Sequence, residues 1–494
     1  MRSLFLFLVF LSVIPVAAAQ IPAAAVETFQ TPPDPHWSSI ATGDVRAAYR
    51  LLKDNHPGAA SEMHDEAFVH RMNAAYALAL QRAAKVDSYQ GYLATLAGFA
   101  TAMGDKHVWS RPTFVVNLPR WPEFLVSKQG DHWVVTDTEP SQSGMKGAAL
   151  LSCDGEAVAE LARKNLGGFR AVWSVGAQQI QSAPWLLVDE GNPFVKRPSS
   201  CVFEQAGRQS TVTLHWVRIK RENLLPRLKS AGGAGAAGFG VRQVGDGYWI
   251  ALQDLVSDKA LRVVQAVQQQ ESSLREARFV VLDLRGNGGG SSVMGREIAK
   301  ALMGEAVVTA RLGSPETDCS SMETYRATPD NLIQLEYVQK QPFVAEGGAE
   351  VRDLVADEIR RVRAALAAGH QFSGEPRCMT QPKQSDTPPS EPPSLLHGKL
   401  ILLTDNACFS SCLAVTDDFR TLGAFHVGQT TDAATHFVDV REQYLPSGYS
   451  LFSTLQAVSG YTYQVGPFDP TLTYDGDIAD TAALENWITQ TVAR

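Results

Sequence analysis

The sequence has no long block of like charges and no excess of basic residues. Its 494 residues include 44 Lys and Arg against 52 Asp and Glu, which gives a formal net charge of -8. Such a balance offers no basic face to a phosphate backbone and no polybasic anchor to anionic lipid. Nucleic acid is therefore not an expected partner. With 45% hydrophobic residues, the chain can bury more than one core, and we expect a globular protein of several domains.

Long hydrophobic runs are missing after the N-terminus. Within residues 1–20, Arg2 precedes an apolar run over residues 4–14, and small residues stand before a cleavage position after Ala19. This run is shorter than the roughly 20 residues that cross a bilayer, and its flanks suit a signal peptidase. We interpret residues 1–19 as a signal peptide in preference to an N-terminal anchor. The expected protein is exported, to the periplasm or the extracellular space, with no membrane span in the mature chain.

Cysteines are few, and none has the spacing of a zinc ligand. The six are scattered along the chain, whereas structural zinc sites need closely spaced pairs. In an exported protein, an even number favours disulfides, although six cysteines allow about 15 connectivities. Pairing between neighbours is our working expectation. It would join Cys153 with Cys201, Cys319 with Cys378, and Cys408 with Cys412.

The hydrophobic pattern divides the chain into three segments. Residues 20–112 contain three stretches with helical spacing, which predict an N-terminal helical bundle, and Asp44 is a plausible N-cap of the first helix. Residues 113–218 have short apolar runs separated by turns, a pattern typical of a β-rich module. Over residues 219–494 strands alternate with helices, which predicts an α/β core. A polar stretch at about residues 313–396, with one predicted helix, interrupts this core.

Two turns in the α/β segment have the composition of a reactive site. The stretch "FVVLDLRGNGGG" runs from a buried strand into four glycines and then into a helix. Such a turn exposes backbone N–H groups to an anion. It lacks the Gly-Lys-Ser/Thr of a Walker loop. A tight turn without a ligand remains an alternative.

The second turn contains Ser410. The stretch "LILLTDNACFSSC" passes from a buried strand to a short amphipathic helix, so Ser410 lies at or near a helix N-terminus. Serine there often caps the helix through its side chain. It could instead attack a substrate, with the helix N-terminus stabilising the resulting oxyanion. The pattern leaves both roles open.

Together, the two motifs resemble those of the tail-specific (C-terminal-processing) and tricorn-like serine peptidases. In that family, a strand ending in Asp-Leu-Arg-x-Asn-x-Gly-Gly supplies an oxyanion donor, and a later strand leads to a serine at a helix start. The similarity extends over most of the mature chain, and "WVVTDTEP" looks like part of a PDZ-like module. The resemblance implies an α/β multidomain fold with an N-terminal helical bundle, a PDZ-like β-rich module and a catalytic core of the ClpP/crotonase type.

The family pattern assigns four residues of this chain to catalysis. Ser410 takes the place of the nucleophile, and the N–H groups of Gly289 and Ser411 take the places of the oxyanion donors. Tail-specific members use a lysine after the serine as the base, but Lys399 is the last lysine here. Tricorn-like members use a histidine at the end of the N-terminal helices. In "GDKHV", His107 occupies that place and is our expected base.

Other members of the expected site stay open. His436 is the alternative base, whereas His56 suits a structural role. Cys408 and Cys412, which flank Ser410, suit structural sulfur better than a thiol nucleophile. Catalysis also needs a carboxylate that orients the imidazole. Tricorn-like relatives carry a glutamate in the C-terminal segment, but the stretch that begins at Tyr461 has none before Glu485. The available carboxylates are Asp105, Asp469, Asp475 and Asp477.

The resemblance implies a serine-type peptidase that cleaves a peptide or protein substrate through an acyl-enzyme, without metal or organic cofactor. Its PDZ-like module would hold an extended peptide by strand addition. The alternative is a catalytically inactive member that binds peptides or apolar ligands, as retinoid-binding relatives do. Lys106, beside the expected base, departs from the family pattern and favours this alternative. A nucleotide-binding enzyme that uses the glycine turn is a third hypothesis. The oligomeric state is open.

Overall fold

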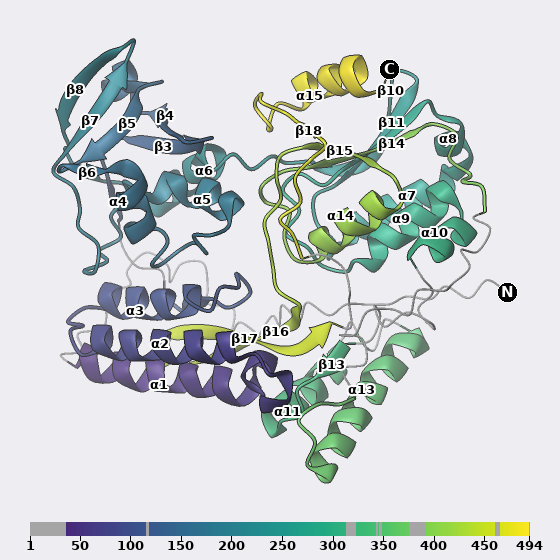
Figure 1. The fold of residues 1–494 in the computed structure, drawn as a ribbon, viewed down its shortest axis with the longest axis horizontal. Coiled ribbons are helices and arrows are strands. Elements are labelled where there is room, and N and C mark those ends of the chain that lie inside the picture. The colour runs from purple at the N-terminus through teal and green to yellow at the C-terminus, as the bar shows by residue number, and fades with distance from the viewer. Residues whose placement is uncertain are drawn as a thin grey trace. The chain divides into compact units, whose positions relative to one another are not determined.

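The computed structural model describes residues 36–114, 118–312, 323–341, 344, 348–374, 392–459 and 465–493. Contacts within the chain divide these residues into two compact units (Figure 1). The described residues within 234–439 and 456–494 form one, which we call the core unit. Those within 36–233 and 440–455 form the other, which we call the helix-sheet unit. The expected signal peptide and the expected pair of Cys319 and Cys378 lie outside the described residues.

The core unit is built on a six-stranded sheet. The strand order is β10-β11-β12-β14-β15-β18, with β10 antiparallel to β11 and the other neighbours parallel. Parallel neighbours require crossover connections, and the helices between these strands provide them. The mixed α/β character predicted for this part of the chain is confirmed. The strands span Phe239–Val244, Gly247–Leu252, Phe279–Asp283, Lys399–Thr404, Phe425–Gly428 and Leu472–Thr473.

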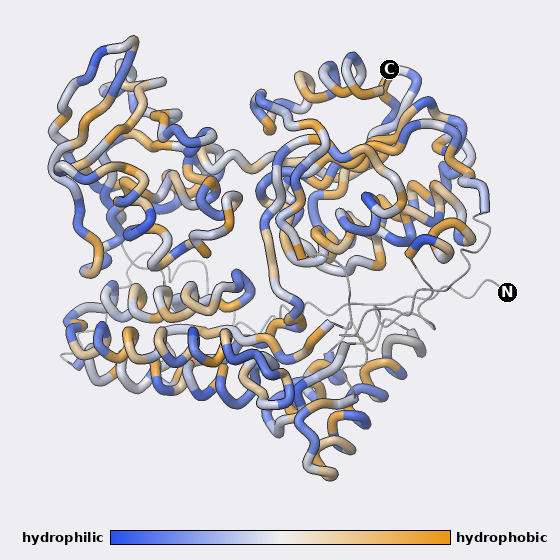
Figure 2. Tube along the Cα trace, viewed as in Figure 1, coloured by the Kyte–Doolittle hydropathy of each residue, from blue (hydrophilic) through white to orange (hydrophobic). Residues whose placement is uncertain are grey.

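Both faces of this sheet are covered, and the alternation of side chains along each strand explains how. On β12, Val280 and Leu282 pack into one apolar cluster, whereas Phe279 and Val281 pack into another. Successive strand residues point to opposite faces, so a strand buried on both faces is a continuous apolar run. Figure 2 shows the central strands as hydrophobic.

Helices cover the two faces unequally. The first of these helices, α7 (Asp258–Gln269), begins after Ser257, whose side chain caps it by accepting a hydrogen bond from Ala260 N. One face is covered by α7, α8 (Glu271–Glu276), α9 (Val293–Met303), α10 (Glu305–Leu312) and α14 (Ser411–Thr421). On the other face lies α15 (Thr481–Trp487), with the chain that follows it.

The segment that interrupts the core has a small core of its own. It contains β13 (Glu323–Tyr325), α11 (Pro329–Gln339) and α13 (Gly348–Ala368), and buried residues of both helices pack together. β13 pairs with the long strand β17 (Ser450–Ser459). The sequence predicted only one helix here. It missed α11 because the apolar residues of that helix do not form a clear stripe.

Three helices that pack against one another open the helix-sheet unit. They are α1 (Trp37–Asn55), α2 (Glu66–Ala83) and α3 (Tyr89–Thr101). The expectation that Asp44 is an N-cap is wrong, because α1 begins at Trp37 and includes Asp44 in its interior. The buried Asp44 carboxylate instead accepts hydrogen bonds from Tyr92 Oη at 2.7 Å and Ser447 N at 3.1 Å. It therefore fastens α1 to α3 and to the 440–455 segment.

The β-rich segment forms a second six-stranded sheet. Its order is β3-β4-β5-β7-β8, with β6 beside β5, and every pair is antiparallel. A disulfide joins Cys153 to Cys201, which are paired positions on β5 and β7. The strands are Phe124–Gln129, His132–Thr138, Ala149–Cys153, Glu156–Ala157, Ser200–Gln205 and Arg208–Thr213. Across the described parts of both units, no helix combines the length and the hydropathy of a membrane span.

Candidate active site

Ser410 lies in the turn between β14 and α14. Its backbone angles are φ 59° and ψ -130°, a region that residues other than glycine rarely occupy. Ser410 directly precedes the first helical residue, yet its side chain makes no capping hydrogen bond with α14. The capping role that the sequence allowed is therefore excluded. Strained backbone of this kind is held by its surroundings and is concentrated at functional sites.

Ser411 is the first residue of α14. Because the first four N–H groups of a helix have no intrahelical acceptor, its amide is available at the positive end of the helix dipole. The Ser411 hydroxyl donates to Gly290 O at 2.5 Å. This bond joins the serine turn to the glycine turn that follows β12.

The glycine turn lies directly against Ser410. Gly289 has a φ of 102°, which glycine adopts without strain. A Cβ atom at this position would lie 2.8 Å from Ser410 Cβ and 2.9 Å from Ser411 N, too close for any side chain. In addition, Phe409 N donates to Asn287 O at 3.2 Å. The two sequence motifs are thus brought together by backbone contacts that only glycine permits.

The N–H group of Gly289 already has a partner in this structure. It donates to Asn287 Oδ1 at 2.8 Å, whereas the sequence assigned it to an oxyanion. An oxyanion would therefore have to share this amide with Asn287 or displace it. Catalytic hydrogen bonds often form fully only when substrate is bound.

Polar residues of the "DLRGN" run hold the glycine turn in place. The Arg285 guanidinium is fully buried against the Asp283 carboxylate, with Nη2 to Oδ2 at 2.6 Å. It also donates from Nη1 to Ile478 O at 2.6 Å. Asn287 Nδ2 donates to Leu252 O at 2.7 Å. Breaking a buried ion pair of this kind costs about 3–5 kcal/mol. These side chains therefore stabilise the conformation of the glycine turn.

Asp405 ties three backbone segments together beside the site. Its Oδ2 accepts from Gly235 N at 2.7 Å and Gly286 N at 2.9 Å, and its Oδ1 accepts from Ala407 N at 3.0 Å. Burial raises the pKa of this carboxyl to about 6 although the three N–H donors oppose the shift. The sequence analysis passed over Asp405. Its position directly after a buried strand was the available signal.

A disulfide brackets the serine. Cys408 and Cys412 are bonded to each other, and both are fully buried. Asp432 N donates to Cys408 O at 3.1 Å, which fixes the start of the bracketed turn. The disulfide closes a loop of five residues with Ser410 at its centre. The prediction that these cysteines are structural is confirmed, as are two of the three expected neighbour pairings.

His107 lies in the helix-sheet unit and is paired there with Asp105. Its Nδ1 is 2.8 Å from Asp105 Oδ1, and its backbone N donates to the same oxygen at 2.8 Å. Both side chains are largely buried, at 9% and 3% exposed. Ser453 holds the loop by donating from Oγ to His107 O at 2.8 Å and accepting from Trp109 N at 2.7 Å. The unassigned carboxylate thus has one candidate in contact with the expected base.

The remaining candidates have other roles or surroundings. His436 directly precedes β16 (Phe437–Tyr444) and is exposed as a residue, although partial desolvation of its imidazole lowers the pKa. His56 is buried, and its Nδ1 accepts from Gly58 N at 3.1 Å, which agrees with the structural role expected for it. Asp469 and Asp477 are exposed and accept hydrogen bonds from Thr430 Oγ1 and Ala479 N.

Comparison with known proteins identifies the segment that carries the serine and glycine turns. Residues 249–461 match the profile of peptidase family S41. This part of the chain is an S41 peptidase domain. The match confirms the resemblance to tail-specific and tricorn-like peptidases, and it supports a serine-type peptidase. No curated protein matches the chain in sequence.

The fold extends beyond the S41 domain to nearly the whole chain. The crystal structure of mature CPAF is similar with a TM-score of 0.57 and 14% identity, over 92% of this chain and 97% of that chain. A structure of mature CPAF complexed with lactacystin gives a TM-score of 0.56 and 13% identity, over 92% and 98%. At such identities the likeness concerns the fold. Ser410, Ser411 and Gly289 meet inside the S41 domain, whereas His107 precedes it.

Proposed function

We propose that this chain is an exported serine peptidase that cleaves peptide bonds through an acyl-enzyme on Ser410. The observation that carries the proposal is the conformation of Ser410. The residue is held at φ 59° against Gly289, in front of a helix that it does not cap. A strained serine between a glycine turn and a helix N-terminus has the surroundings that nucleophilic attack and oxyanion stabilisation require.

The proposed base is His107, oriented by Asp105. A carboxylate only accepts hydrogen bonds, so the contact from Asp105 favours the tautomer with its proton on Nδ1. The lone pair on Nε2 can then take the proton of the Ser410 hydroxyl. The Asp105 charge stabilises the imidazolium that forms, the role a carboxylate has in a catalytic triad. The approach of His107 to Ser410 is part of the proposal, since the two residues belong to different units.

The reaction then follows in two halves. Ser410 Oγ attacks the peptide carbonyl while His107 accepts its proton, and the carbonyl oxygen becomes an oxyanion bound by the N–H groups of Ser411 and Gly289. Collapse of this intermediate breaks the C–N bond, and His107 returns the proton to the leaving amine. Water, deprotonated by His107, releases the acyl group from Ser410 in the second half.

Substrate binding and location complete the proposal. The antiparallel sheet of β3 to β8 would act as the PDZ-like module, adding an extended peptide of the substrate as a further strand. The three helices before it would form the N-terminal bundle of the family. Export through the segment of residues 1–19 places the enzyme in the periplasm or outside the cell, where the Cys153–Cys201 and Cys408–Cys412 disulfides are stable.

One observation favours the alternative of a peptide-binding member without catalysis. The N–H group of Gly289 is paired with Asn287, so the resting site presents one fewer oxyanion donor. Loss of a single donor reduces kcat by about 10²–10³-fold. An enzyme in which Asn287 keeps this amide would be correspondingly slow or inactive.

Labelling with a fluorophosphonate probe separates the two functions. We expect the full-length protein to be labelled on Ser410, and labelling to disappear in Ser410→Ala and to fall strongly in His107→Gln. Ser292→Ala, which changes a nearby serine at the start of α9, is the matched control and should be labelled like the wild type. A folded protein that no fluorophosphonate labels would exclude the hydrolase and leave the binding function.

A further inference from the structure

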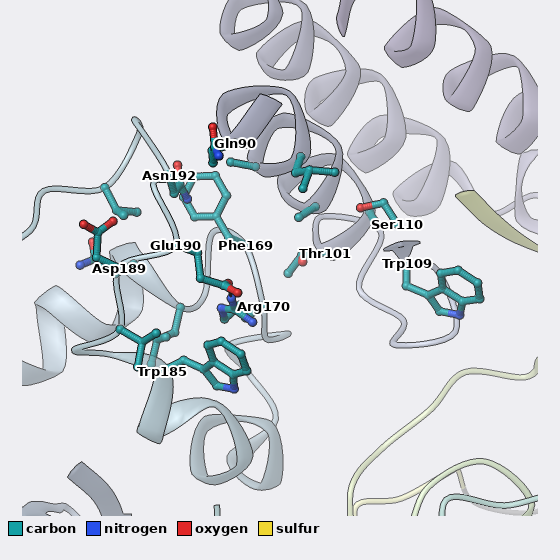
Figure 3. Close-up of a pocket in the computed structure, with 18 of the residues that line it drawn as sticks. Gln90, Thr101, Trp109, Ser110, Phe169, Arg170, Trp185, Asp189, Glu190 and Asn192 are labelled. Atoms are coloured by element: carbon teal, nitrogen blue, oxygen red, sulfur yellow. Dashed lines mark hydrogen bonds and ion pairs between the residues drawn. The ribbon is translucent and has the colours of Figure 1, made fainter. Parts of the chain in front are cut away.

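The helix-sheet unit contains a cavity of about 520 Å³, and apart from Asp105 the proposed chemistry uses none of its lining residues (Figure 3). Helix α3 and residues 108–114 form one wall. Parts of residues 165–172 and 185–198 form the other, together with Trp216 and Arg221. The volume falls within the range of ligand-binding sites, about 300–1,000 Å³.

The wall formed by α3 is apolar and elongated. Leu93, Ala97 and Thr101 lie on one face at a spacing of four residues, and all three are partly exposed to the cavity. Lining residues extend from Gln90 to Thr101, which corresponds to about 17 Å of helix at 1.5 Å per residue. An extended chain rises about 3.3 Å per residue. The wall therefore matches the length of about five residues of an extended peptide.

The opposite wall carries a cluster of charges on an aromatic ring. The Glu190 carboxylate is shared by two guanidiniums, those of Arg170 and Arg221, and the Arg221 Nη1 atom lies 2.6 Å from Glu190 Oε1. The Arg170 guanidinium also stacks over Trp185, with its carbon 3.8 Å from the ring centroid. Figure 3 shows Arg170, Glu190 and Trp185 on one side of the space and Thr101 and Trp109 on the other.

This cluster has an uncompensated positive charge. Burial opposes ionisation of Glu190, but the two guanidiniums outweigh it and lower the pKa of Glu190. Two cations and one anion leave a net charge of +1. The side chains of Arg170 and Arg221 remain 34% and 37% exposed, so they can reach a ligand. The nearby pair of Arg197 and Asp189, with Nη1 2.8 Å from Oδ2, adds no net charge.

The cavity also adjoins the loop that carries the proposed base. Asp105, Val108 and Trp109 line it, and Asp105 is the residue that contacts His107. A ligand in the cavity is therefore next to the backbone of the His107 loop. Such a position suits a substrate segment remote from the bond that is cleaved.

We propose that this cavity binds an extended segment of the peptide substrate through a carboxylate, held by Arg170 and Arg221 on the Trp185 side, with apolar residues along α3. The inference rests on the proposed peptidase function and adds a preference for acidic substrates. A planar guanidinium suits a carboxylate because it can donate two parallel hydrogen bonds. The carboxylate can be a glutamate or aspartate side chain or a peptide C-terminus.

Binding to the full-length Ser410→Ala protein, which cannot turn over, tests the preference. Fluorescence anisotropy would compare three short fluorescein-labelled peptides of equal length. One has a central Glu and an amidated C-terminus, the second has Gln in its place and is amidated, and the third has Gln and a free C-terminus. We expect one of the two carboxylate peptides to bind about tenfold more tightly than the neutral one, a difference of about 1.4 kcal/mol, because its hydrogen bonds to a guanidinium are charge-assisted. The better binder identifies the source of the carboxylate.

Two substitutions that change the net charge of the cluster in opposite directions make the test specific for charge. Arg170→Gln removes the net charge and should abolish the advantage of the carboxylate peptide. Glu190→Gln releases both guanidiniums and should increase it. Arg163→Gln, which alters an exposed arginine of α4 (Val158–Asn165) outside the cavity, is the control and should bind like the parent. Each variant is first checked for an unchanged melting temperature and circular dichroism.

The outcomes separate the cavity from the catalytic proposal. Equal affinity for all three peptides, or a loss of affinity in Glu190→Gln as large as in Arg170→Gln, would overturn the acidic preference. Fluorophosphonate labelling of the protein with an intact Ser410 reports on the peptidase independently. Labelling together with equal peptide affinities would reject the cavity site while leaving the peptidase function in place.

Discussion

The imidazole Nδ1 of His107 lies 2.8 Å from Oδ1 of Asp105, two residues earlier in the same loop. The same oxygen also accepts the backbone N–H of His107. A carboxylate held in this way fixes both the ring and the loop that carries it. We therefore propose Asp105 as a positioning residue for the proposed base, from a place in the chain where the family pattern did not suggest one.

Replacement of Asp105 by asparagine tests this role. We expect Asp105→Asn to reduce kcat by about 10²–10⁴-fold with little change in KM, because an amide does not stabilise the imidazolium and can favour the wrong tautomer. The measurement is the rate of fluorophosphonate labelling and of peptide cleavage between pH 5 and pH 9. Asp131→Asn, an exposed aspartate of the same unit, is the control. A wild-type rate in Asp105→Asn would show that this carboxylate has no part in catalysis.

A side chain at position 289 should clash with Ser410 and so reduce the reactivity of the site. In Gly289→Ala, the new methyl group would lie 2.8 Å from Ser410 Cβ at a φ of 102°. We expect labelling of Ser410 to fall by on the order of 10²-fold, because displacement of a reacting group by about 1 Å has such an effect. Gly288→Ala is the matched control, since a Cβ at Gly288 meets no atom within 4 Å. Equal labelling of the two variants would contradict the close packing of the two turns.

The two disulfides should differ in what they stabilise. In the chain-entropy account, the loop between Cys408 and Cys412 contributes only about 2 kcal/mol, whereas the longer loop between Cys153 and Cys201 contributes about 4 kcal/mol. We expect the Cys408→Ala/Cys412→Ala protein to label on the order of tenfold more slowly, because the strained Ser410 loses its clamp.

The other disulfide provides the comparison. The Cys153→Ala/Cys201→Ala protein should unfold at a lower denaturant concentration but label at the wild-type rate while folded. Chemical denaturation and labelling kinetics of both variants measure the two effects separately. A Cys408→Ala/Cys412→Ala protein that labels normally would show that the surrounding chain holds Ser410 without the disulfide.

We expect His426 to make the stability of the protein depend on pH. Burial, together with the charge of Arg420, lowers the pKa of this histidine from 6.5 to about 4, and its Nε2 lies 2.7 Å from Thr404 Oγ1. Between pH 6.5 and pH 4, the unfolded chain therefore binds a proton that the folded chain does not. The stability that neutral His426 contributes is present above pH 6.5 and is lost as the pH falls toward 4.

The size of this loss of stability follows from the pKa shift of His426. Relative to His426→Gln, which does not titrate, the wild type should lose about 3 kcal/mol of unfolding free energy between pH 7 and pH 4. Urea denaturation of both proteins across this range gives the difference, in which the contributions of other titrating groups cancel. A difference that is independent of pH would mean that His426 has the same pKa in the folded protein and in the unfolded chain.

The sequence predicted the α/β core well because its strands are buried on both faces. The run "FVVLD" is apolar at every position up to Asp283, and this continuous pattern has few other interpretations. The position of Ser410 before a helix followed in the same way from two clear local patterns. Its backbone conformation did not, because the value of φ depends on the glycine turn, which is distant in the sequence.

Long-range contacts account for what the sequence missed. Aspartate is a residue type that often caps helices, which is why the sequence suggested this role for Asp44. Its actual partners, Tyr92 and Ser447, lie far along the chain. The hydrogen bond from Gly289 to Asn287 depends on a side-chain orientation that composition does not encode. The cavity between α3 and the 185–198 segment likewise requires the tertiary structure, because its two walls have no common sequence motif.

The central claim is that the imidazole of His107 meets the hydroxyl of Ser410. A peptidyl chloromethyl ketone tests it directly, since Ser410 Oγ would add to the ketone while His107 Nε2 displaces chloride and forms a stable N–C bond. Peptide mapping by mass spectrometry should then find the alkyl group on His107 in the wild type and not in Ser410→Ala. Alkylation of another residue such as His436, or of none, in a protein whose Ser410 reacts with fluorophosphonate would contradict the account.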